Sequence, residues 1–446
     1  MRTPWLVKHK LLWGAHDRSD SPYDLRSLLV ALDLPAGKRP ERRVMSSQPA
    51  TDRNGARTSL RLLLPPGGTA LPLRIAVLAP PWIPVPPGGY GGIEAVVELL
   101  CEGLMARGHD VTLFAAPGSR STARVHALLE DAHPDAIGSA LHDSDHVACA
   151  WEEVEQAAAR GQPFHVVHDH SAFTALAMAD RVGVPVVHTI HGAFDRDTTR
   201  FYRRHGHKAT LVAISRSQAA SAPTGVRIAA VVPNPVAVDR WALKTDKEEY
   251  VLWIGRMAPV KGAHLAIEAA RLAGRALVLA GPVQTGHEQY FREKIEPHID
   301  GLRVRYVGEV GGAAKQRLYA NARALLMPIR WPEPFGMVML EALASGTPVI
   351  AFPEGAATEI VIDGENGMLV SDESEMARAI DQMGAIGAID PARCRASVAE
   401  RYDIAVTATG YERVYRYAAG VALASAALAP HIQPNRDLRA SGHSVR

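Results

Sequence analysis

One segment of the chain restricts the fold more than any other. It reads Glu-Pro-Phe-Gly-Met-Val-Met-Leu-Glu from Glu333 to Glu341, and it continues to Gly346-Thr347-Pro348. Because glycine commonly ends helices and proline does not fit inside them, the pattern predicts a loop, a helix starting near Gly336, a stop at Gly346 and a strand over 348–351. Glu333 then lies just before the helix, and Glu341 about one turn inside it.

This segment has the chemistry of a site for a phosphorylated, hydroxyl-rich ligand. The free N–H groups and the dipole at a helix start attract phosphate, and Gly336 lets the backbone approach a ligand closely. Glu341 can accept hydrogen bonds from two neighbouring hydroxyls, such as a ribose diol, and Glu333 can bind the hydroxyls of a sugar. The simpler alternative is a surface helix with two solvated glutamates, which the Pro-Phe-Gly and Gly-Thr-Pro elements make less attractive.

Apolar strands alternate with helices in two long stretches, which predicts an α/β fold. The first stretch has strands over 74–79, 111–115, 164–168, 184–190, 209–214 and 228–232, with helices over 93–107 and 171–182. A polar segment from Pro233 to Glu249 is a predicted hinge. The second stretch has strands over 250–254, 276–280, 304–307 and 324–327, with helices over 263–272, 286–298, 314–321, 373–383, 391–402 and 404–419.

The predicted architecture is two doubly wound, Rossmann-like parallel-sheet domains. We expect a first domain over 73–240, a second over 250–410, and a C-terminal helix and tail over 411–446. Residues 1–72 fit no domain and are expected to be a disordered or non-native extension, since they mix short apolar pieces with Pro, Gly, Ser and Arg.

Composition narrows the class of protein. Residues 1–70 carry a net charge of +6, which leaves a mildly acidic body and does not favour nucleic acid as a partner. Three scattered cysteines form neither a disulfide framework nor a metal pattern. No apolar run reaches the length of a membrane span, and Met1–Gly14 lacks the features of a signal peptide. The predicted compartment is the cytoplasm.

Candidate ligand groups follow several strands, where open parallel sheets bind their ligands. Arg256 and Lys261 leave one strand end together and can neutralise a diphosphate, although either alone reads as a surface charge in a turn. The loop Gly88-Gly89-Tyr90-Gly91-Gly92 can place N–H groups near a phosphate, but a plain tight turn explains it equally well. It lacks the G-x-G-x-x-G spacing of a dinucleotide site.

Histidines also follow two strands of the first stretch. His168-Asp169-His170 is tempting as a metal site, but the spacing matches no standard zinc site and strand neighbours point to opposite faces. His191, which precedes a glycine, is the better active-site candidate, with an ordinary loop histidine as its alternative.

Two other charged features are weaker. The Asp-x-Asp triplets at Asp195 and Asp143 resemble a metal motif but follow no clear strand, so we reject them. The basic, aromatic segment 200–208 suits an acidic acceptor or an anionic membrane surface, but a solvated helix face is the more probable interpretation.

Gly255-Arg256, Lys261-Gly262, Glu333-Pro334-Phe335-Gly336, Glu341 and Gly346-Thr347-Pro348 together resemble the donor half of glycosyltransferase family 4. The resemblance covers roughly 73–419 and is weaker in the first half. It implies the GT-B fold, with two Rossmann-like domains facing across a cleft, and a retaining sugar transfer from a nucleoside diphosphate. Neither a metal nor another cofactor is expected.

The resemblance also implies roles for individual residues. Arg256 and Lys261 would bind the diphosphate, Glu333 the donor sugar and Glu341 the ribose. His191 would match the family's active-site histidine. The remaining donor contacts would come from Gly89, Gly91, Gly92, Val310, Phe335, Gly336, Met337 and Val338, with Val310 beside the base. Asn234-Pro235 and the single glycine in Pro353-Glu354-Gly355 depart from the family's commoner residues.

Alternative functions remain open at this point. A GT-B sugar-nucleotide epimerase, a phosphorylase, or a binding protein that holds a nucleotide sugar without turnover would share much of this pattern. The sequence leaves open the sugar, the base and the acceptor, which is expected to be a sugar, a lipid or a small molecule. A weak peripheral membrane contact through 200–208 is a further expectation.

Overall fold

Two parallel β-sheets organise the residues that the computed structural model describes, which are 71–171, 173–383 and 389–420. The predicted extension 1–72, apart from its last two residues, and the tail after residue 420 lie outside the described residues. Every paired strand in both sheets is parallel. The α/β class with two doubly wound parallel sheets is therefore confirmed.

The first sheet has the strand order β3-β2-β1-β4-β5-β6-β7. Its strands are β1 (Arg74–Leu78), β2 (Asp110–Ala115), β3 (Arg124–Ala127), β4 (Val166–Asp169), β5 (Val186–Ile190), β6 (Thr210–Ala213) and β7 (Ala230–Val231). The helices within this stretch are α1 (Gly92–Ala106), α2 (Ala140–Ala159), α3 (Thr174–Ala177), α4 (Arg196–His205) and α5 (Arg216–Ala220).

The second sheet has the order β10-β9-β8-β11-β12-β13. Its strands are β8 (Tyr250–Ile254), β9 (Ala276–Ala280), β10 (Val304–Tyr306), β11 (Ala324–Met327), β12 (Val349–Ala351) and β13 (Gly367–Leu369). The helices that follow β8 are α6 (Ala263–Leu272), α7 (Glu288–Lys294), α8 (Gly312–Asn321), α9 (Met337–Ala344), α10 (Ala357–Ile360), α11 (Glu373–Gln382), α12 (Pro391–Tyr402) and α13 (Ile404–Ala418).

Strand β1 illustrates why these strands are apolar throughout. Ile75 and Val77 pack into a cluster with residues of α1 and α13, whereas Ala76 and Leu78 pack on the opposite face with residues of α2. Successive side chains of a strand point to opposite faces, and both faces of this sheet are covered by helices. The second sheet is also buried on both faces, with α9 and α12 on one and α6 and α11 on the other.

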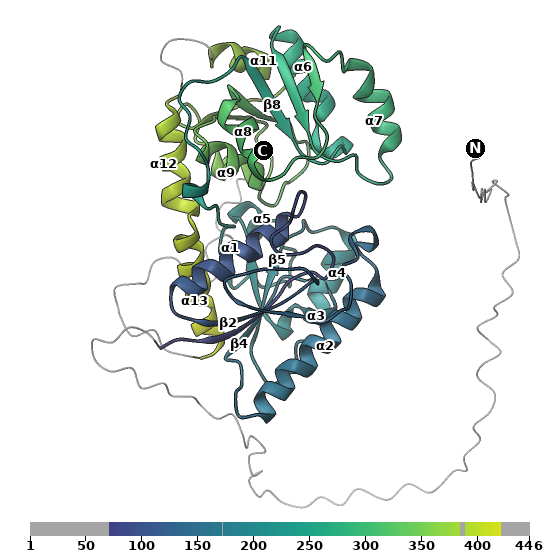
Figure 1. Ribbon diagram of the computed structural model, residues 1–446, viewed down its shortest axis with the longest axis vertical. Helices are drawn as coiled ribbons and strands as arrows, with labels where there is room; N and C mark the ends of the chain where they lie inside the picture. Colours follow the sequence, from purple (N-terminus) through teal and green to yellow (C-terminus); the bar gives the residue numbers. More distant parts are fainter. Residues whose placement is uncertain (1–70, 172, 384–388, 421–446) are drawn as a thin grey trace, which may run out of the picture. The chain divides into compact units, whose positions relative to one another are not determined.

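The last described helix, α13, belongs to the core of the first sheet and lies beside α1 (Figure 1). A Cβ on Gly103 of α1 would lie 2.8 Å from the Cβ of Ala408 and 2.7 Å from Ile404, so glycine is what allows this close approach. The domain boundary expected at residue 410 falls inside α13. Helix α13 thus completes the domain with which the described residues begin.

Two helix predictions were too long. Of the described residues in the range 171–182, only Thr174–Ala177 is α-helical. Amides that follow bond to carbonyls three residues back, as Arg181 does to Met178. Of the range 286–298, only Glu288–Lys294 is α-helical. Pro297 has no N–H and would clash with the preceding turn, so the chain continues as a 3₁₀ turn.

Two elements between 117 and 163 escaped prediction. The edge strand β3 has no fully buried residue, and α2 begins with a polar run that hides its apolar face.

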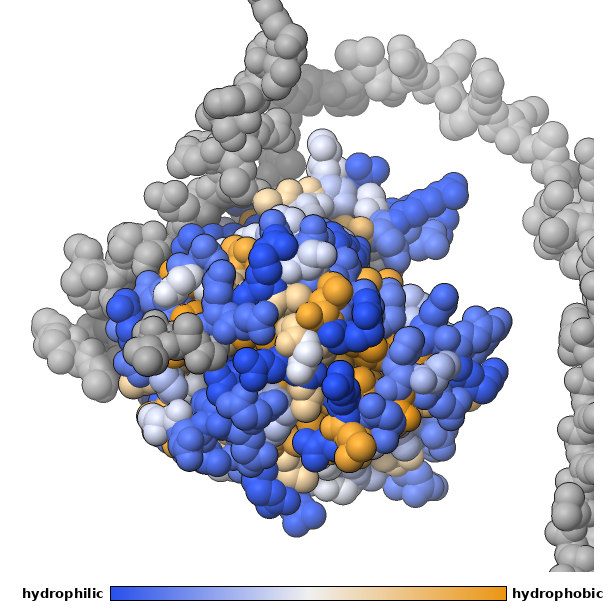
Figure 2. All heavy atoms as spheres, turned by 90° about the horizontal axis from the view of Figure 1, so that it is seen from above, coloured by the Kyte–Doolittle hydropathy of each residue, from blue (hydrophilic) through white to orange (hydrophobic). Residues whose placement is uncertain are grey.

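Within the residues described, no helix combines the length and the apolar character needed to cross a bilayer. On the face shown in Figure 2, apolar residues form small patches between hydrophilic ones.

Candidate active site

Three of the predicted site residues lie at the carboxyl ends of the second sheet's central strands. The strand order reverses between β8 and β11, and this is where open parallel sheets bind ligands. Arg256 and Lys261 follow β8, and Glu333 follows β11. Strand order therefore brings together residues that are more than 70 positions apart.

Lys261 and Glu333 form an ion pair at this edge. Lys261 Nζ lies 2.5 Å from Glu333 Oε2, and the Trp331 indole N–H donates to the same oxygen at 2.9 Å. The loop carrying Lys261 can reach this position because Gly262 is left-handed, at φ 74°, and a Cβ there would lie 2.2 Å from the Pro328 carbonyl oxygen. The structure thus brings two of the predicted residues into direct contact.

Helix α9 begins at Met337, with Gly336 as its N-cap at φ 92°. This agrees with the predicted helix start. Phe335 is buried just before it, and a Cβ on Gly336 would lie 2.8 Å or less from the ends of Met327 and Met339. The first-turn amides of a helix, here those of Met337 and Val338, have no acceptor within the helix and remain available to a ligand.

Glu341 is held from helix α8. Its side chain is 10% exposed, its Oε1 lies 2.6 Å from Lys315 Nζ, and its Oε2 accepts from the Tyr319 hydroxyl at 2.8 Å. Because a carboxylate has about four lone-pair sites, both oxygens can still accept a ligand hydroxyl.

Arg256 has different partners from Lys261. Its Nη1 donates to Gln284 Oε1 at 2.8 Å, and its guanidinium lies 5.6 Å from the ring centre of Tyr90 in the glycine-rich loop. The two cations predicted to share one diphosphate are therefore held by separate contacts at the same strand end.

The glycine-rich loop contacts the loop that carries Val310. The Tyr90 N–H donates to Glu309 Oε1 at 2.6 Å, and a Cβ on Gly89 would lie 2.2 Å from that oxygen. A Cβ on Gly311 would lie 2.1 Å from the Gly88 carbonyl oxygen. One amide of the loop expected to approach a phosphate is thus engaged by a carboxylate. Val310 is half-buried beside this contact.

Helix α1 starts directly after the glycine-rich loop, at Gly92, with Gly91 as its N-cap. Its first turn carries Glu94, which is only 5% exposed. Burial raises the pKa of this carboxyl to about 7, against a backbone hydrogen bond that lowers it. The sequence motifs did not indicate a role for Glu94.

His191 follows β5 and contacts another histidine, with its Nε2 lying 2.9 Å from Nδ1 of His170. Burial lowers the pKa of His191 to about 3, so the ring is neutral at pH 7. The His168-Asp169-His170 run is split between faces. His168 contacts Thr189 and Tyr415, whereas Asp169 lies 2.5 Å from Nδ1 of His188.

Among the residues described, no group of three or more His, Cys, Asp or Glu side chains is placed to hold a metal ion. The expectation that the reaction needs no metal stays a prediction. Asp195 instead caps helix α4 by accepting from the Thr198 N–H, and Asp143 lies within α2.

Several residues of the site were missed by sequence reasoning, namely Trp331, Gln284, Lys315, Tyr319 and Glu309, and His170 was considered only as part of a metal site. One signal was available, because Lys315 and Tyr319 are four residues apart on one helix and so share a face. Trp331 and Glu309 are close in sequence to the predicted residues Glu333 and Val310, whereas Gln284 reaches the site from a loop that is distant in sequence.

Two family models match adjacent parts of the chain. Residues 90–240 match Glycosyltransferase Family 4, and residues 237–395 match Glycosyl transferases group 1. A D-inositol 3-phosphate glycosyltransferase from Frankia alni is 29% identical over 353 residues, covering 66% of this chain and 86% of its own. A phosphatidyl-myo-inositol mannosyltransferase from Mycobacterium tuberculosis is 27% identical over 381 residues, covering 78% and 98%.

The crystal structure of AviGT4, a glycosyltransferase involved in avilamycin A biosynthesis, is 28% identical and matches with a TM-score of 0.59. The match covers 79% of this chain and 99% of that one. The family models, the relatives and the two parallel sheets all indicate the same family and the same fold. The chain therefore belongs to glycosyltransferase family 4, as a retaining, nucleotide-sugar-dependent glycosyltransferase with the GT-B fold.

Proposed function

We propose that the donor's diphosphate is bound by Arg256, Lys261 and the start of helix α9. The observation that carries this proposal is the Lys261–Glu333 ion pair at the carboxyl ends of β8 and β11. An ammonium has three N–H donors, so Lys261 can keep its contact with Glu333 while it donates to a phosphate oxygen. The amides of Phe335, Gly336, Met337 and Val338 add donors and the positive end of a helix dipole.

The other donor contacts follow from the same arrangement. Both bonds to Glu333 use Oε2, which supports a role for its other oxygen in binding sugar hydroxyls. Glu341, oriented by Lys315 and Tyr319, would accept the ribose hydroxyls. Val310 would lie beside the base, the loop carrying Gly89, Gly91 and Gly92 would approach the phosphates, and His191 would face the reacting sugar.

In this arrangement the protein's main contribution is electrostatic. When the nucleoside diphosphate departs, negative charge develops on its phosphate and positive charge on the anomeric carbon. Arg256, Lys261 and the α9 amides stabilise the phosphate charge without a metal or another cofactor. A phosphate oxygen on the same face can take the acceptor proton, and bound reactants need little further positioning.

The double variant Arg256→Ala, Lys261→Ala tests this assignment. We expect kcat/KM for nucleoside diphosphate release to fall by roughly 100-fold or more, because charge stabilisation at a leaving group carries much of such a reaction. Arg271→Ala is the control, since Arg271 lies on the exposed face of α6 and pairs with Glu268. Unchanged transfer in the double variant would contradict the assignment.

The identity of the donor can be narrowed down by measuring which nucleotide sugars protect the protein against thermal unfolding, and the relatives suggest which acceptors to try first. Uridine, guanosine and adenosine diphosphate sugars should differ in how far they raise the unfolding temperature, since only a ligand that binds the folded state stabilises it. Two relatives are named for inositol-containing acceptors, which makes inositol 3-phosphate a sensible first acceptor alongside sugars and lipids.

A weak membrane contact through helix α4 is the remaining part of the proposal. All four arginines of this helix are exposed, but Arg203 bonds to the Thr224 carbonyl oxygen, and Lys208, just beyond the helix, bonds to Asp180. Within the segment 200–208, Arg200 and Arg204 are therefore the arginines best placed to meet an anionic surface. Binding to anionic vesicles at low salt should therefore be weak, reversed by salt and lost in Arg200→Ala, Arg204→Ala. No binding at low salt would end this part of the proposal.

A further inference from the structure

Buried histidines form a continuous hydrogen-bonded chain that ends at His191. His170 Nδ1 lies 2.9 Å from His191 Nε2, and His170 Nε2 lies 3.2 Å from His168 Nδ1. His168 Nδ1 in turn lies 2.7 Å from the Tyr415 hydroxyl. His168 and His170 are both 0% exposed, so these contacts replace the hydrogen bonds that the two rings would otherwise make to water.

The two sheet strands and α13 bring this chain together. Residues two apart on a strand point to the same face, which places His168 and His170 together and turns Asp169 to the other side. On the neighbouring strand Thr189 lies 2.8 Å from His168 Nε2 and 2.8 Å from the Tyr411 hydroxyl. Both tyrosines belong to α13, so its C-terminal half lies at the far end of the chain of contacts.

The chain also restricts where protons lie. Burial lowers the pKa of His168 and His170 well below the usual value, so both rings are neutral at pH 7. A contact between two neutral imidazoles needs a donor N–H on one ring and an acceptor nitrogen on the other. Burial raises the pKa of Tyr415, whose hydroxyl therefore keeps its proton. The tautomers of the rings are thus coupled, because a proton on the contacting nitrogen of one ring requires a lone pair on the contacting nitrogen of the next.

We propose that His170 is a positioning residue that fixes the orientation and the tautomer of His191, and that Tyr415 of α13 supports it through His168. The contact uses Nε2 of His191, so it determines whether the Nδ1 atom of that ring presents a proton or a lone pair. This inference rests on the proposed role of His191 at the donor sugar.

The test compares His170→Phe with His170→Asn. Phenylalanine fills the space without a hydrogen bond, whereas the asparagine amide occupies roughly the place of Nδ1 and can restore the bond. We expect His170→Phe to lower kcat by roughly 10- to 100-fold with donor KM changed by less than about twofold, since misplacing a reacting group costs turnover. His170→Asn should recover much of the loss.

The matched control is His146→Gln. His146 is also 0% exposed, and its Nε2 contacts the Ala79 carbonyl oxygen at 3.1 Å, but it is not part of the chain. It should keep kcat near the original value. Ring ¹⁵N chemical shifts of His191 give a second readout, because they report its tautomer directly. They should change in His170→Phe and, in the same direction, in Tyr415→Phe.

The outcomes separate this inference from the proposed function. Loss of activity in His191→Ala without loss in His170→Phe overturns the positioning role alone, as do unchanged ¹⁵N shifts. Full activity in His191→Ala overturns the proposed role of His191, and the ¹⁵N shifts then still decide whether His170 orders its ring.

Discussion

The carboxyl of Glu94 illustrates how one buried group makes stability depend on pH. Its pKa rises on folding from 4.5 to about 7, so the folded state binds more protons than the unfolded state between these values. The stability that this group contributes is present below pH 4.5 and is lost as pH rises through 7. The shift corresponds to roughly 3 kcal/mol.

The substitution Glu94→Gln should remove this loss of stability at high pH, because the side-chain amide is neutral at every pH. We expect the free energy of unfolding of Glu94→Gln to exceed that of the unmodified protein at pH 8, while the two differ much less at pH 5. Urea unfolding at both values measures this. Glu152→Gln, on the exposed face of α2, is the control. Parallel pH curves for the unmodified protein and Glu94→Gln would contradict the prediction.

At the scale of loops and helices, the segment after β12 supports Glu333. Gly355 has φ 55°, and a Cβ there would lie 2.2 Å from the Glu333 carbonyl oxygen and 2.5 Å from its nitrogen. The Ala356 N–H also donates to that carbonyl at 3.0 Å. The loop at Gly355 therefore holds the backbone that carries the Lys261–Glu333 pair.

Gly355→Ala should therefore cost activity as well as stability. Left-handed backbone costs an alanine roughly 1–2 kcal/mol, and the Glu333 backbone must also move. Since small misplacements can cost about 100-fold, we expect kcat to fall by roughly 10- to 100-fold. Gly364→Ala is the matched control, because Gly364 has φ 73° and nothing within 4 Å of the added Cβ. If Gly355→Ala and Gly364→Ala have equal activity, the clash with the Glu333 backbone does not affect catalysis. The only effect left is then the left-handed backbone strain that both variants share.

Elements were predictable from the sequence where local pattern determines them. The α9 start at Gly336 and the helices 263–272 and 391–402 follow from glycine, proline and apolar spacing. Gln284 was not predictable, because it reaches Arg256 from the loop of another strand. Trp331 and Glu309 lie beside predicted residues, but no local pattern shows which atoms their side chains contact. Motif matching singled out Lys261 and Glu333 separately, but their direct contact depends on the approach of Gly262 to Pro328.

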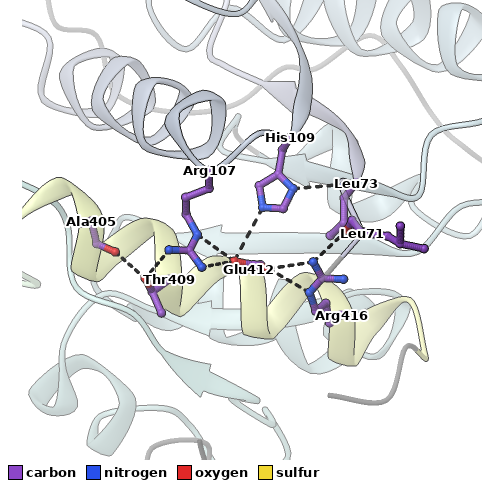
Figure 3. Close-up of polar contacts among 8 residues, drawn as sticks. All are labelled: Leu71, Leu73, Arg107, His109, Ala405, Thr409, Glu412 and Arg416. Carbon is purple, nitrogen blue, oxygen red and sulfur yellow. Dashed lines mark hydrogen bonds and ion pairs between the residues drawn. The ribbon is translucent and has the colours of Figure 1, made fainter. Parts of the chain in front are cut away.

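For the whole molecule, a partly buried charge cluster attaches α13 to the first domain (Figure 3). Glu412 accepts from Arg107 Nε at 2.7 Å and from Arg416 Nε at 3.0 Å, and it lies 3.8 Å from His109 Nε2. Arg416 is 2% exposed and also donates to the Leu71 carbonyl oxygen. The cluster thus ties the last helix to the entry of β1 and the end of α1.

Glu412→Gln should loosen this attachment. The His109 ring, 3.8 Å away, and then the hydrogen bonds from Arg416 and Arg107 lower the pKa of Glu412 below 4.5, so its stabilisation is present above pH 4.5 and is lost as pH falls below it. Leaving Arg416 buried without its partner costs roughly 3–5 kcal/mol. We expect lower stability at pH 7, a weaker loss of stability on acidification, and earlier proteolysis of α13. Glu400→Gln, exposed on α12, is the control.

The same variant links the attachment of α13 to the active site. Tyr411 and Tyr415 pack in the core of the first sheet and contact Thr189 and His168, so a helix that detaches withdraws both hydroxyls from the histidine chain. Under conditions where Glu412→Gln remains folded, the ¹⁵N shifts of His191 should move toward those of Tyr415→Phe. If α13 becomes accessible to protease while those shifts stay unchanged, the helix stabilises the domain but does not influence His191.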